Sequence, residues 1–216
     1  MAINTSKYFN ILEELKPKHV KLIAVSKLQP TNAIRSFYKL GQRDFAENYV
    51  QELVEKHENL KNLEINWHFI GHLQSNKVKY IAPFVNIIHS VDSLKLLKEI
   101  NKEAKKNYRV IDCLLQVYIA KEETKYGLSN DELVEILGYQ KANHLENVKI
   151  IGLMGMASFV DDESVIRNEF RYLKSLENLS ASFNEFSFGM SQDYKLAVEE
   201  GSTMIRIGSL IFGSRS

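Results

Sequence analysis

The chain has 216 residues, of which 44% are hydrophobic and 25% are charged, a composition typical of a soluble globular protein with a full hydrophobic core. Its 28 basic residues nearly balance its 27 acidic residues, so the formal net charge of +1 argues against a nucleic-acid-binding or membrane-binding surface. The single cysteine, Cys113, excludes a disulfide framework and a thiolate metal site. Neither a signal peptide nor an apolar run of the ~18 residues that a membrane helix needs is present, so we expect a cytoplasmic protein.

The expected elements alternate regularly along the chain. A helix is expected first, over residues 5–16. Eight short apolar runs follow, separated by amphipathic stretches such as VQELVEKHENL, in which apolar residues recur every three or four positions. Continuously apolar strands that alternate with helices predict a parallel sheet covered by helices. The expected strands are residues 22–26, 43–46, 67–70, 85–90, 112–119, 149–155, 186–189 and 204–208.

Eight such units predict an α/β fold, a closed (β/α)8 TIM-like barrel that forms a single domain over residues 1–216, with the first helix as an extra element. The rival fold is an open doubly wound sheet. That fold usually carries a glycine-rich turn after its first strand, whereas here the first strand leads into SKLQP. The barrel is therefore favoured.

In such barrels the carboxyl ends of the strands and the loops after them form the active face. Polar or small side chains follow most of the expected strands, and we expect them to ring one mouth. They are Lys27, Asn48, His72, His89, Asp92, Met154, Ser191, Arg206, Gly208 and Ser209.

The loops after the last two strands favour an anionic ligand. Their sequences, GMSQD and RIGSLIFG, place glycines and hydroxyls where helices begin, and such positions offer free backbone N–H groups to a phosphate. Taken alone, a lysine after a strand is more often a solvated charge, and Gly-Ser pairs are more often turns. Together, a lysine amine opposite a phosphate cradle favours a phosphate ligand that bears an aldehyde, which describes pyridoxal phosphate (PLP).

Several ordered motifs carry a more specific resemblance: AVSKLQP, FAENYVQE, WHFIGHLQSNK, HSVDS, GLMGMA, FSFGMSQDYKLAVEEGSTMIRIGS and IFGSR. With them the chain resembles the pyridoxal phosphate homeostasis protein family, relatives of the alanine racemase barrel, which is fold type III among PLP proteins. The resemblance implies that PLP is held as an internal aldimine on Lys27. It also implies that Ser191, Gly208 and Ser209 hold the phosphate and that Arg206 faces the pyridine nitrogen.

Asn48 and His72 lie in family motifs without a definite contact. The chain also departs from the family pattern. Ala46 stands where glycine is common and Phe188 where methionine is common, and both look like packing changes. Threonine is usual at the position of Ser209, so the hydroxyl survives. The loop AKEETKYGLS has Tyr126 in place of a small residue, which puts the role of that loop in doubt.

An arginine beside the pyridine nitrogen opposes protonation of the ring, which weakens the cofactor as an electron sink. The racemases compensate with a second base from an additional domain, as the resemblance implies, and the chain ends at Ser216, which leaves no room for such a domain. We therefore expect a PLP carrier that buffers the cofactor and delivers it to apoenzymes, and that acts as a monomer. The alternatives are a PLP-dependent amino-acid racemase of low activity, a Schiff-base aldolase barrel and a purely structural role.

Overall fold

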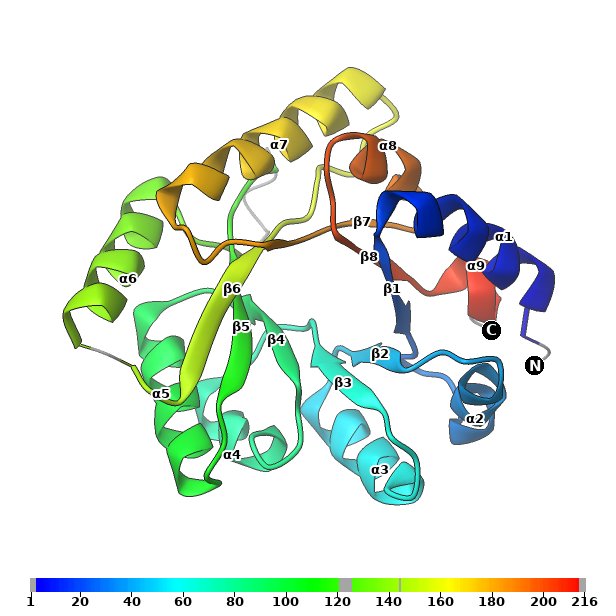
Figure 1. Ribbon diagram of the computed structural model, residues 1–216, viewed down its shortest axis with the longest axis horizontal. Helices are drawn as coiled ribbons and strands as arrows, with labels where there is room; N and C mark the ends of the chain where they lie inside the picture. Colours follow the sequence, from blue (N-terminus) through cyan, green and yellow to red (C-terminus); the bar gives the residue numbers. More distant parts are fainter. Residues whose placement is uncertain (1–2, 121–125, 144, 214–216) are drawn as a thin grey trace.

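The computed structural model describes residues 3–120, 126–143 and 145–213. Within these residues, eight parallel strands close into a barrel in sequence order, and the last strand pairs with the first. The helices lie around the outside of the barrel (Figure 1). The predicted (β/α)8 barrel is therefore confirmed. The strands are β1 Lys21–Val25, β2 Asp44–Glu47, β3 Asn66–Phe69, β4 Ile87–Val91, β5 Ile111–Gln116, β6 Val148–Met154, β7 Glu185–Met190 and β8 Met204–Ile207.

Helices separate the strands along the described chain, and each buries an apolar face against the barrel. The α-helices are α1 Thr5–Leu15, α2 Thr31–Lys39, α3 Val50–Leu60, α4 Val78–Ile81, α5 Leu94–Lys106, α6 Asn130–Asn143, α7 Glu163–Ser175, α8 Tyr194–Glu199 and α9 Ser209–Phe212. Short 3-10 turns add η1 Lys16–Lys18, η2 Ser75–Lys77 and η3 Leu176–Leu179.

The expected N-terminal helix is present as α1. The Asn4 side chain caps it by accepting a hydrogen bond of 3.0 Å from the Lys7 backbone N–H. The helix ends at Leu15, one residue before the predicted boundary, and continues into the 3-10 turn that contains Pro17. Proline has no N–H and its ring clashes with the preceding helical turn, so it ends the regular helix here.

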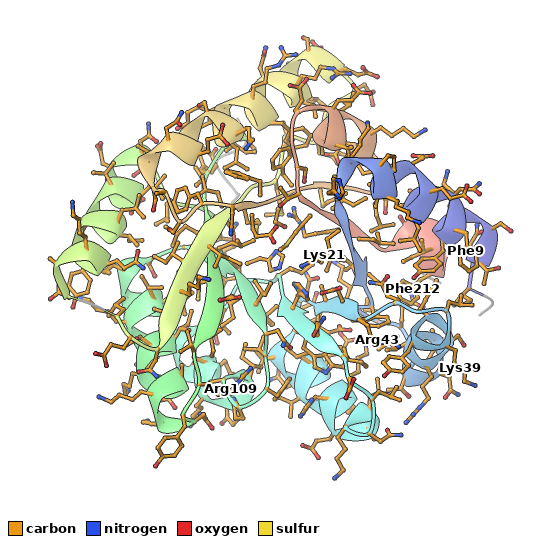
Figure 2. The ribbon with its side chains drawn as sticks, viewed as in Figure 1. Phe9, Lys21, Lys39, Arg43, Arg109 and Phe212 are labelled. Atoms are coloured by element: carbon orange, nitrogen blue, oxygen red, sulfur yellow. The ribbon has the colours of Figure 1, made fainter. Side chains whose placement is uncertain are left out.

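Helix α1 packs over the segment that closes the barrel. The Tyr8 ring lies 5.0 Å from that of Phe37, which in turn contacts Phe212 of α9 at 4.9 Å. The Asn4 N–H also donates to the Ile211 carbonyl at 2.8 Å. Figure 2 shows Phe212 beside α1. The two ends of the described chain are thereby fastened together next to β1.

Strand β5 ends earlier than the sequence predicts. The expected strand runs over residues 112–119, but the sheet pairing stops at Gln116. Beyond that point the chain pairs with the returning segment instead: Tyr118 N–H donates to the Leu128 carbonyl at 3.0 Å, and Leu128 N–H donates to the Gln116 carbonyl at 2.7 Å. The residues just after Gln116 therefore form bridge contacts with the segment around Leu128, outside the named strands of the barrel.

The inside of the barrel holds its own core, separate from the larger core between strands and helices. Since strand residues two apart share a face, buried polar residues such as Arg206, two positions after Met204, and His89, two positions after Ile87, also point inward. The apolar residues of this inner core are Ile23, Val25, Ala46, Ile87, Leu114, Ile151, Met154 and Met204.

A pair of glycine substitutions tests this barrel packing. Gly152 of β6 pairs with Glu185 of β7, and a Cβ at Gly152 would lie 1.7 Å from the Glu185 carbonyl oxygen. We expect Gly152→Ala to lower the free energy of unfolding by about 3 kcal/mol, because two paired strands would have to separate. Gly138, in helix α6, has open space around it, so Gly138→Ala should add up to about 1 kcal/mol of stability. Urea unfolding measures both, and equal stabilities would contradict the packing.

Candidate functional site

The seam between β1 and β8 places Lys27 and Gly208 at the same mouth of the barrel. The two strands run parallel with Ala24 opposite Ile207, so Lys27 and Gly208 follow at the carboxyl ends of neighbouring strands. A Cβ on Gly208 would lie 3.2 Å from the Val25 carbonyl oxygen, which shows how closely the two segments approach. Lys27 is half-buried. The predicted amine and the predicted anion cradle therefore share one end of the molecule.

The loops after β7 and β8 also meet there. The Gly208 N–H donates a long hydrogen bond of 3.4 Å to the Ser191 hydroxyl oxygen. The Ser191 loop is held by Asp193, whose carboxylate accepts a bond of 2.6 Å from the Met190 N–H. Ser209 is exposed and begins α9 directly after Gly208. The three residues that the sequence assigned to a phosphate cradle thus lie at one junction.

Arg206 lies deeper than the rim on which the sequence placed it. Its side chain is buried inside the barrel, where Nη1 donates to the carbonyl and hydroxyl oxygens of Ser187 at 2.6 and 2.7 Å and Nη2 donates to the Gly155 carbonyl at 3.0 Å. Burial lowers the pKa of Arg206 to about 10, although Asp193 opposes this shift. The guanidinium therefore remains a cation at neutral pH, below the cradle.

His89 does not ring the mouth, so that prediction is wrong. His89 lies within β4, two residues after the inward-facing Ile87, so its side chain points into the barrel and is fully buried. Met154, the last residue of β6, is likewise buried in the inner core. Asp92 directly follows β4 and does lie among the loops at the carboxyl ends of the strands.

Asn48 follows β2 and lies against the next loop. A Cβ at Gly71 would lie 2.0 Å from the Asn48 carbonyl oxygen, so the loops after β2 and β3 are in close contact. The Asn48 side-chain oxygen Oδ1 is buried without a hydrogen-bond partner in the part of the chain that the structure describes. A buried acceptor without a partner is costly, and it suits a site that takes a polar ligand.

His72 joins three loops of the mouth. Its Nδ1 lies 3.1 Å from Asp92 Oδ2, in the loop after β4, and its ring stacks on that of Tyr126 at 4.3 Å, in the loop after β5. The Tyr126 carbonyl accepts a bond of 2.7 Å from Gln116 Nε2. The sequence left the roles of His72 and Tyr126 open, and here both hold neighbouring loops together. Residues 121–125 of the AKEETKYGLS loop lie outside the described residues.

Sequence reasoning missed a buried charged cluster that supports the turn around Lys27. The Lys56 ammonium on α3 donates to the Ser26 carbonyl at 2.6 Å and to the carboxylates of Glu47 and Glu52 at 2.8 and 2.7 Å. The Ser26 hydroxyl donates to Glu47 at 2.6 Å, and the Leu28 N–H donates to Glu52 at 2.6 Å. The residues before and after Lys27 are therefore both fixed to this cluster.

The cluster holds an unusual backbone conformation. Leu28 has a φ of 61°, in the left-handed region that residues with a side chain rarely adopt, and its side chain is 64% exposed. No apolar burial compensates for this conformation, so the bond from its N–H to Glu52 stabilises the turn. The available sequence signal was the i, i+4 spacing of Glu52 and Lys56, which is more often a solvated pair.

Glu47 gives the cluster a dependence on pH. Burial raises its pKa from 4.5 to about 7, although the charge and hydrogen bond of Lys56 act in the opposite direction. Between these two pH values the folded protein binds a proton that the unfolded chain releases, so the free energy of unfolding falls as pH rises from 4.5 to 7. Outside this window the group contributes no slope.

We therefore expect Glu47→Gln to flatten the decline in stability between pH 4.5 and 7, because the amide does not titrate. The part that disappears has an upper bound of about 3 kcal/mol, at roughly 1.4 kcal/mol per pKa unit. Urea unfolding at a series of pH values measures it, with Glu58→Gln, an exposed position on the same helix, as control. An unchanged slope in Glu47→Gln would contradict this role.

Comparison with known proteins places this architecture in a family. The alanine racemase N-terminal domain family matches residues 6–216. The chain is 44% identical to the pyridoxal phosphate homeostasis protein of Aquifex aeolicus, over 90% of this chain and 87% of that protein. It is 41% identical to the human protein of the same name, over 90% of this chain and 76% of that protein. The chain belongs to the pyridoxal phosphate homeostasis protein family.

Solved structures agree with this family. The chain resembles PipY of Synechococcus elongatus with PLP bound, at 35% identity and a TM-score of 0.88, over 96% of this chain and 99% of that one. The fold is also that of an alanine racemase from Clostridium difficile, at 16% identity and a TM-score of 0.74, over 99% of this chain and 57% of that one.

In the part of the present chain that the structure describes, no helix has the length and apolar character needed to span a membrane. Those residues also hold no group of three or more metal-binding side chains.

Proposed function

We propose that this protein binds PLP at the carboxyl-end mouth of the barrel and serves intracellular PLP homeostasis by holding and releasing the cofactor. The observation that carries the proposal is the β1–β8 seam, which leads Lys27 and the cradle residues Ser191 and Gly208 to one mouth. The PLP-bound state of PipY, a family member of nearly the same length, supports it. The unpartnered Oδ1 of Asn48 fits a polar ligand at this mouth.

Lys27 is the residue that would hold the cofactor covalently. Its amine would condense with the cofactor aldehyde, with one water released, and the reverse addition of water would free both the cofactor and the amine. The Ser26, Glu47 and Lys56 cluster holds the turn in place while the amine is consumed and restored.

The loops after β7 and β8 would hold the phosphate. Ser191 offers a hydroxyl and Gly208 a backbone N–H, now joined by a bond of 3.4 Å that a phosphate oxygen replaces with stronger, charge-assisted bonds. Ser209, which is exposed at the start of α9, adds its hydroxyl and its backbone N–H. A side chain at 208 would press against the Val25 carbonyl, so glycine suits this close approach of the two segments.

Arg206 would set the chemical character of the bound cofactor. PLP supplies an electron sink for carbanions when its ring nitrogen is protonated. A buried guanidinium beside that nitrogen disfavours protonation, since a second positive charge would have to form next to the first. Such a site favours storage of the cofactor over catalysis, and apoenzymes that require PLP are the proposed recipients.

Substitution of Lys27 tests the covalent attachment. We expect wild-type protein incubated with PLP to retain an absorption band of the bound cofactor after gel filtration. Lys27→Ala should lose that band, because Lys27 is the amine placed after β1 at the seam with Gly208. Lys61→Ala, which removes an exposed lysine after α3, is the control and should behave as wild type.

An unchanged band in Lys27→Ala would exclude the attachment. A second outcome bears on the role of the protein: robust conversion of L-alanine to D-alanine by wild type, absent in Lys27→Ala, would assign a racemase in place of a carrier.

The cradle is tested by comparing PLP with pyridoxal, which lacks the phosphate. We expect Ser191→Ala to bind PLP about 10-fold more weakly, the usual effect of losing one hydrogen bond to a charged group, and to bind pyridoxal as wild type does. Ser182→Ala, an exposed serine before β7, should change neither affinity. Equal losses for both ligands in Ser191→Ala would remove Ser191 from the cradle.

A further inference from the structure

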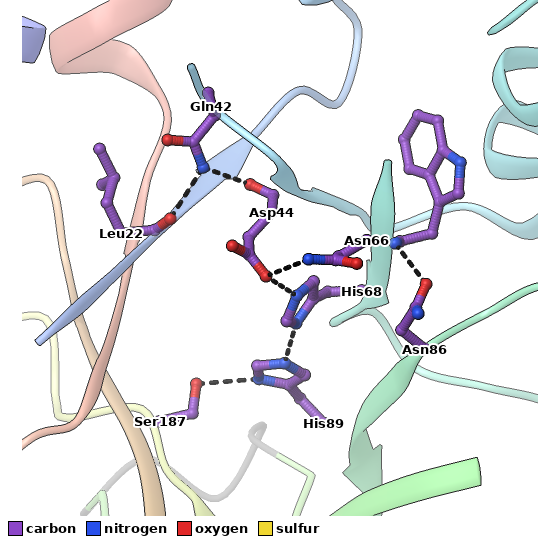
Figure 3. Close-up of polar contacts among 9 residues, drawn as sticks. Leu22, Gln42, Asp44, Asn66, His68, Asn86, His89 and Ser187 are labelled. Atoms are coloured by element: carbon purple, nitrogen blue, oxygen red, sulfur yellow. Dashed lines mark hydrogen bonds and ion pairs between the residues drawn. The ribbon is translucent and has the colours of Figure 1, made fainter. Parts of the chain in front are cut away.

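A continuous chain of hydrogen bonds runs through the inside of the barrel, from Arg206 to the opposite mouth. Figure 3 shows the part from Ser187 through His89 and His68 to Asp44. Arg206 Nη1 lies 2.7 Å from Ser187 Oγ, and Ser187 Oγ lies 2.9 Å from His89 Nδ1. His89 Nε2 lies 2.8 Å from His68 Nδ1, and His68 Nε2 lies 3.0 Å from Asp44 Oδ1. Four strands besides β8 contribute to it, namely β7, β4, β3 and β2, and none of these contacts was visible in the sequence motifs.

The chemistry of the groups fixes the direction of every link. A guanidinium can only donate, so Ser187 Oγ accepts from Arg206 and gives its own proton to His89 Nδ1. His89 then carries its proton on Nε2 and donates to His68 Nδ1, and His68 donates from Nε2 to the Asp44 carboxylate. The Asp44 carboxylate can only accept, so His68 must donate to it from Nε2, and with both imidazoles neutral the other links then run in this order. In neutral histidines, the geometry therefore places the proton on Nε2 of both rings.

The charges around the chain favour the same state. Burial lowers the pKa of His89 well below its ordinary value, and the positive charges of Arg206 and Lys21 lower it further. At Asp44 burial acts to raise the pKa, but the net shift is downward, because His68 and Asn66 donate hydrogen bonds to the carboxylate and Lys21 lies nearby. The chain thus begins at a cation and ends at a carboxylate, with neutral groups between.

Asp44 lies at the amino-end mouth, away from the proposed PLP site. It starts β2 and lines a cavity of about 340 Å³ together with Lys21, which starts β1, and Arg109, which precedes β5. Figure 2 shows these two cations at the starts of their strands. The Asp44 side chain is 20% exposed. The carboxylate end of the chain is therefore accessible to solvent, whereas its arginine end is not.

Arg206 needs such a partner. Each hydrogen bond that the described residues accept from its guanidinium ends on a neutral oxygen, of Ser187 or Gly155. The negative charge of Asp193 opposes the effect of burial on the Arg206 pKa without reversing it, so the buried cation remains costly. A directed chain that ends on Asp44 polarises each link in the sense that stabilises the cation and fixes its orientation.

We propose that Ser187, His89, His68 and Asp44 are positioning residues for Arg206, and that through it they keep the ring nitrogen of bound PLP unprotonated. This proposal rests on the proposed function for its second half, since it assumes that Arg206 faces that nitrogen. The first half concerns only the protein. A guanidinium held in one orientation keeps an N–H directed at the ring, and a loosened one lets the nitrogen take up a proton.

The first experiment needs no cofactor, so it separates failure of the chain from failure of the proposed function. Nitrogen-15 NMR of the histidine rings in PLP-free protein should show His68 and His89 neutral and protonated on Nε2. Ser187→Ala removes the donor to His89 Nδ1 and should change the His89 signals. Ser202→Ala is the matched control, because its buried hydroxyl lies within hydrogen-bond distance of backbone carbonyls of β7 and β8 and does not join the chain. A charged His89, or one protonated on Nδ1, would overturn the proposal.

The second experiment follows the ring nitrogen of nitrogen-15-labelled PLP bound to the protein over a pH series. We expect Ser187→Ala to raise the pH midpoint of nitrogen protonation by about one unit, a tenfold change in proton affinity that matches the loss of one hydrogen bond to a charged group. Asp44→Asn should raise it in the same direction and by less, because the amide oxygen still accepts from His68. Asp112→Asn, which lines the same cavity without joining the chain, should leave it unchanged.

Asp44→Asn keeps the size of the side chain, so it tests the proposal even where Ser187→Ala fails to fold. Wild-type midpoints in both variants would overturn the positioning role. Absence of PLP binding by wild type would instead refute the proposed function and leave the NMR result on the histidines to decide the chain.

Discussion

The parallel pairing of β1 with β8 is the constraint on which the candidate site depends. It joins the first and last strands of the described chain, with Ala24 opposite Ile207, and so carries Lys27 to the same mouth as Gly208. Helices α1 and α9 reinforce the seam through the Tyr8, Phe37 and Phe212 contacts outside it. Residues about 180 positions apart in sequence thereby become neighbours, and a ligand that bears both an aldehyde and a phosphate can be held at both ends.

Two buried polar systems flank this mouth, and each supports a different functional group. Outside the barrel, Lys56 draws Ser26, Glu47 and Glu52 together and fixes the turn that presents Lys27. Inside the barrel, a directed chain leads from Arg206 to Asp44. In both systems, charged side chains are joined to histidine or serine side chains by hydrogen bonds. Buried polar groups that are hydrogen-bonded in this way add rigidity. The seam brings the groups together, and these systems orient them.

The strand-end residues were predictable because their positions follow from topology. Once eight alternating units imply a closed barrel, residues directly after the strands, such as Lys27, Ser191 and Gly208, must lie at one end. Depth was harder to predict. His89 lay within the expected strand, but its place inside the barrel depends on which face of β4 turns inward, and the apolar run gave no alternation from which to read that face. Arg206 was assigned to the correct strand but not to its buried position.

The contacts within the two polar systems were beyond the reach of the sequence. Glu52 and Lys56 have the spacing of an ordinary exposed helical pair, and only the packing of α3 against the end of β1 buries them. Similarly, His68 and His89 come from strands whose other residues read as continuous apolar runs. Their link depends on which face of each strand turns inward and on the stagger between strands, both of which are set by barrel closure.

The central claim is that the amine after the first strand is the point at which this barrel holds PLP. Borohydride reduction of the PLP-treated protein, followed by mass spectrometry of its peptides, tests it most directly, since reduction makes the bond to the cofactor permanent. The account predicts the added mass on the peptide that contains Lys27, in stoichiometric amount and absent when Ser191 and Lys27 are both replaced by alanine. Modification spread over the exposed lysines, or centred on another lysine, would contradict it.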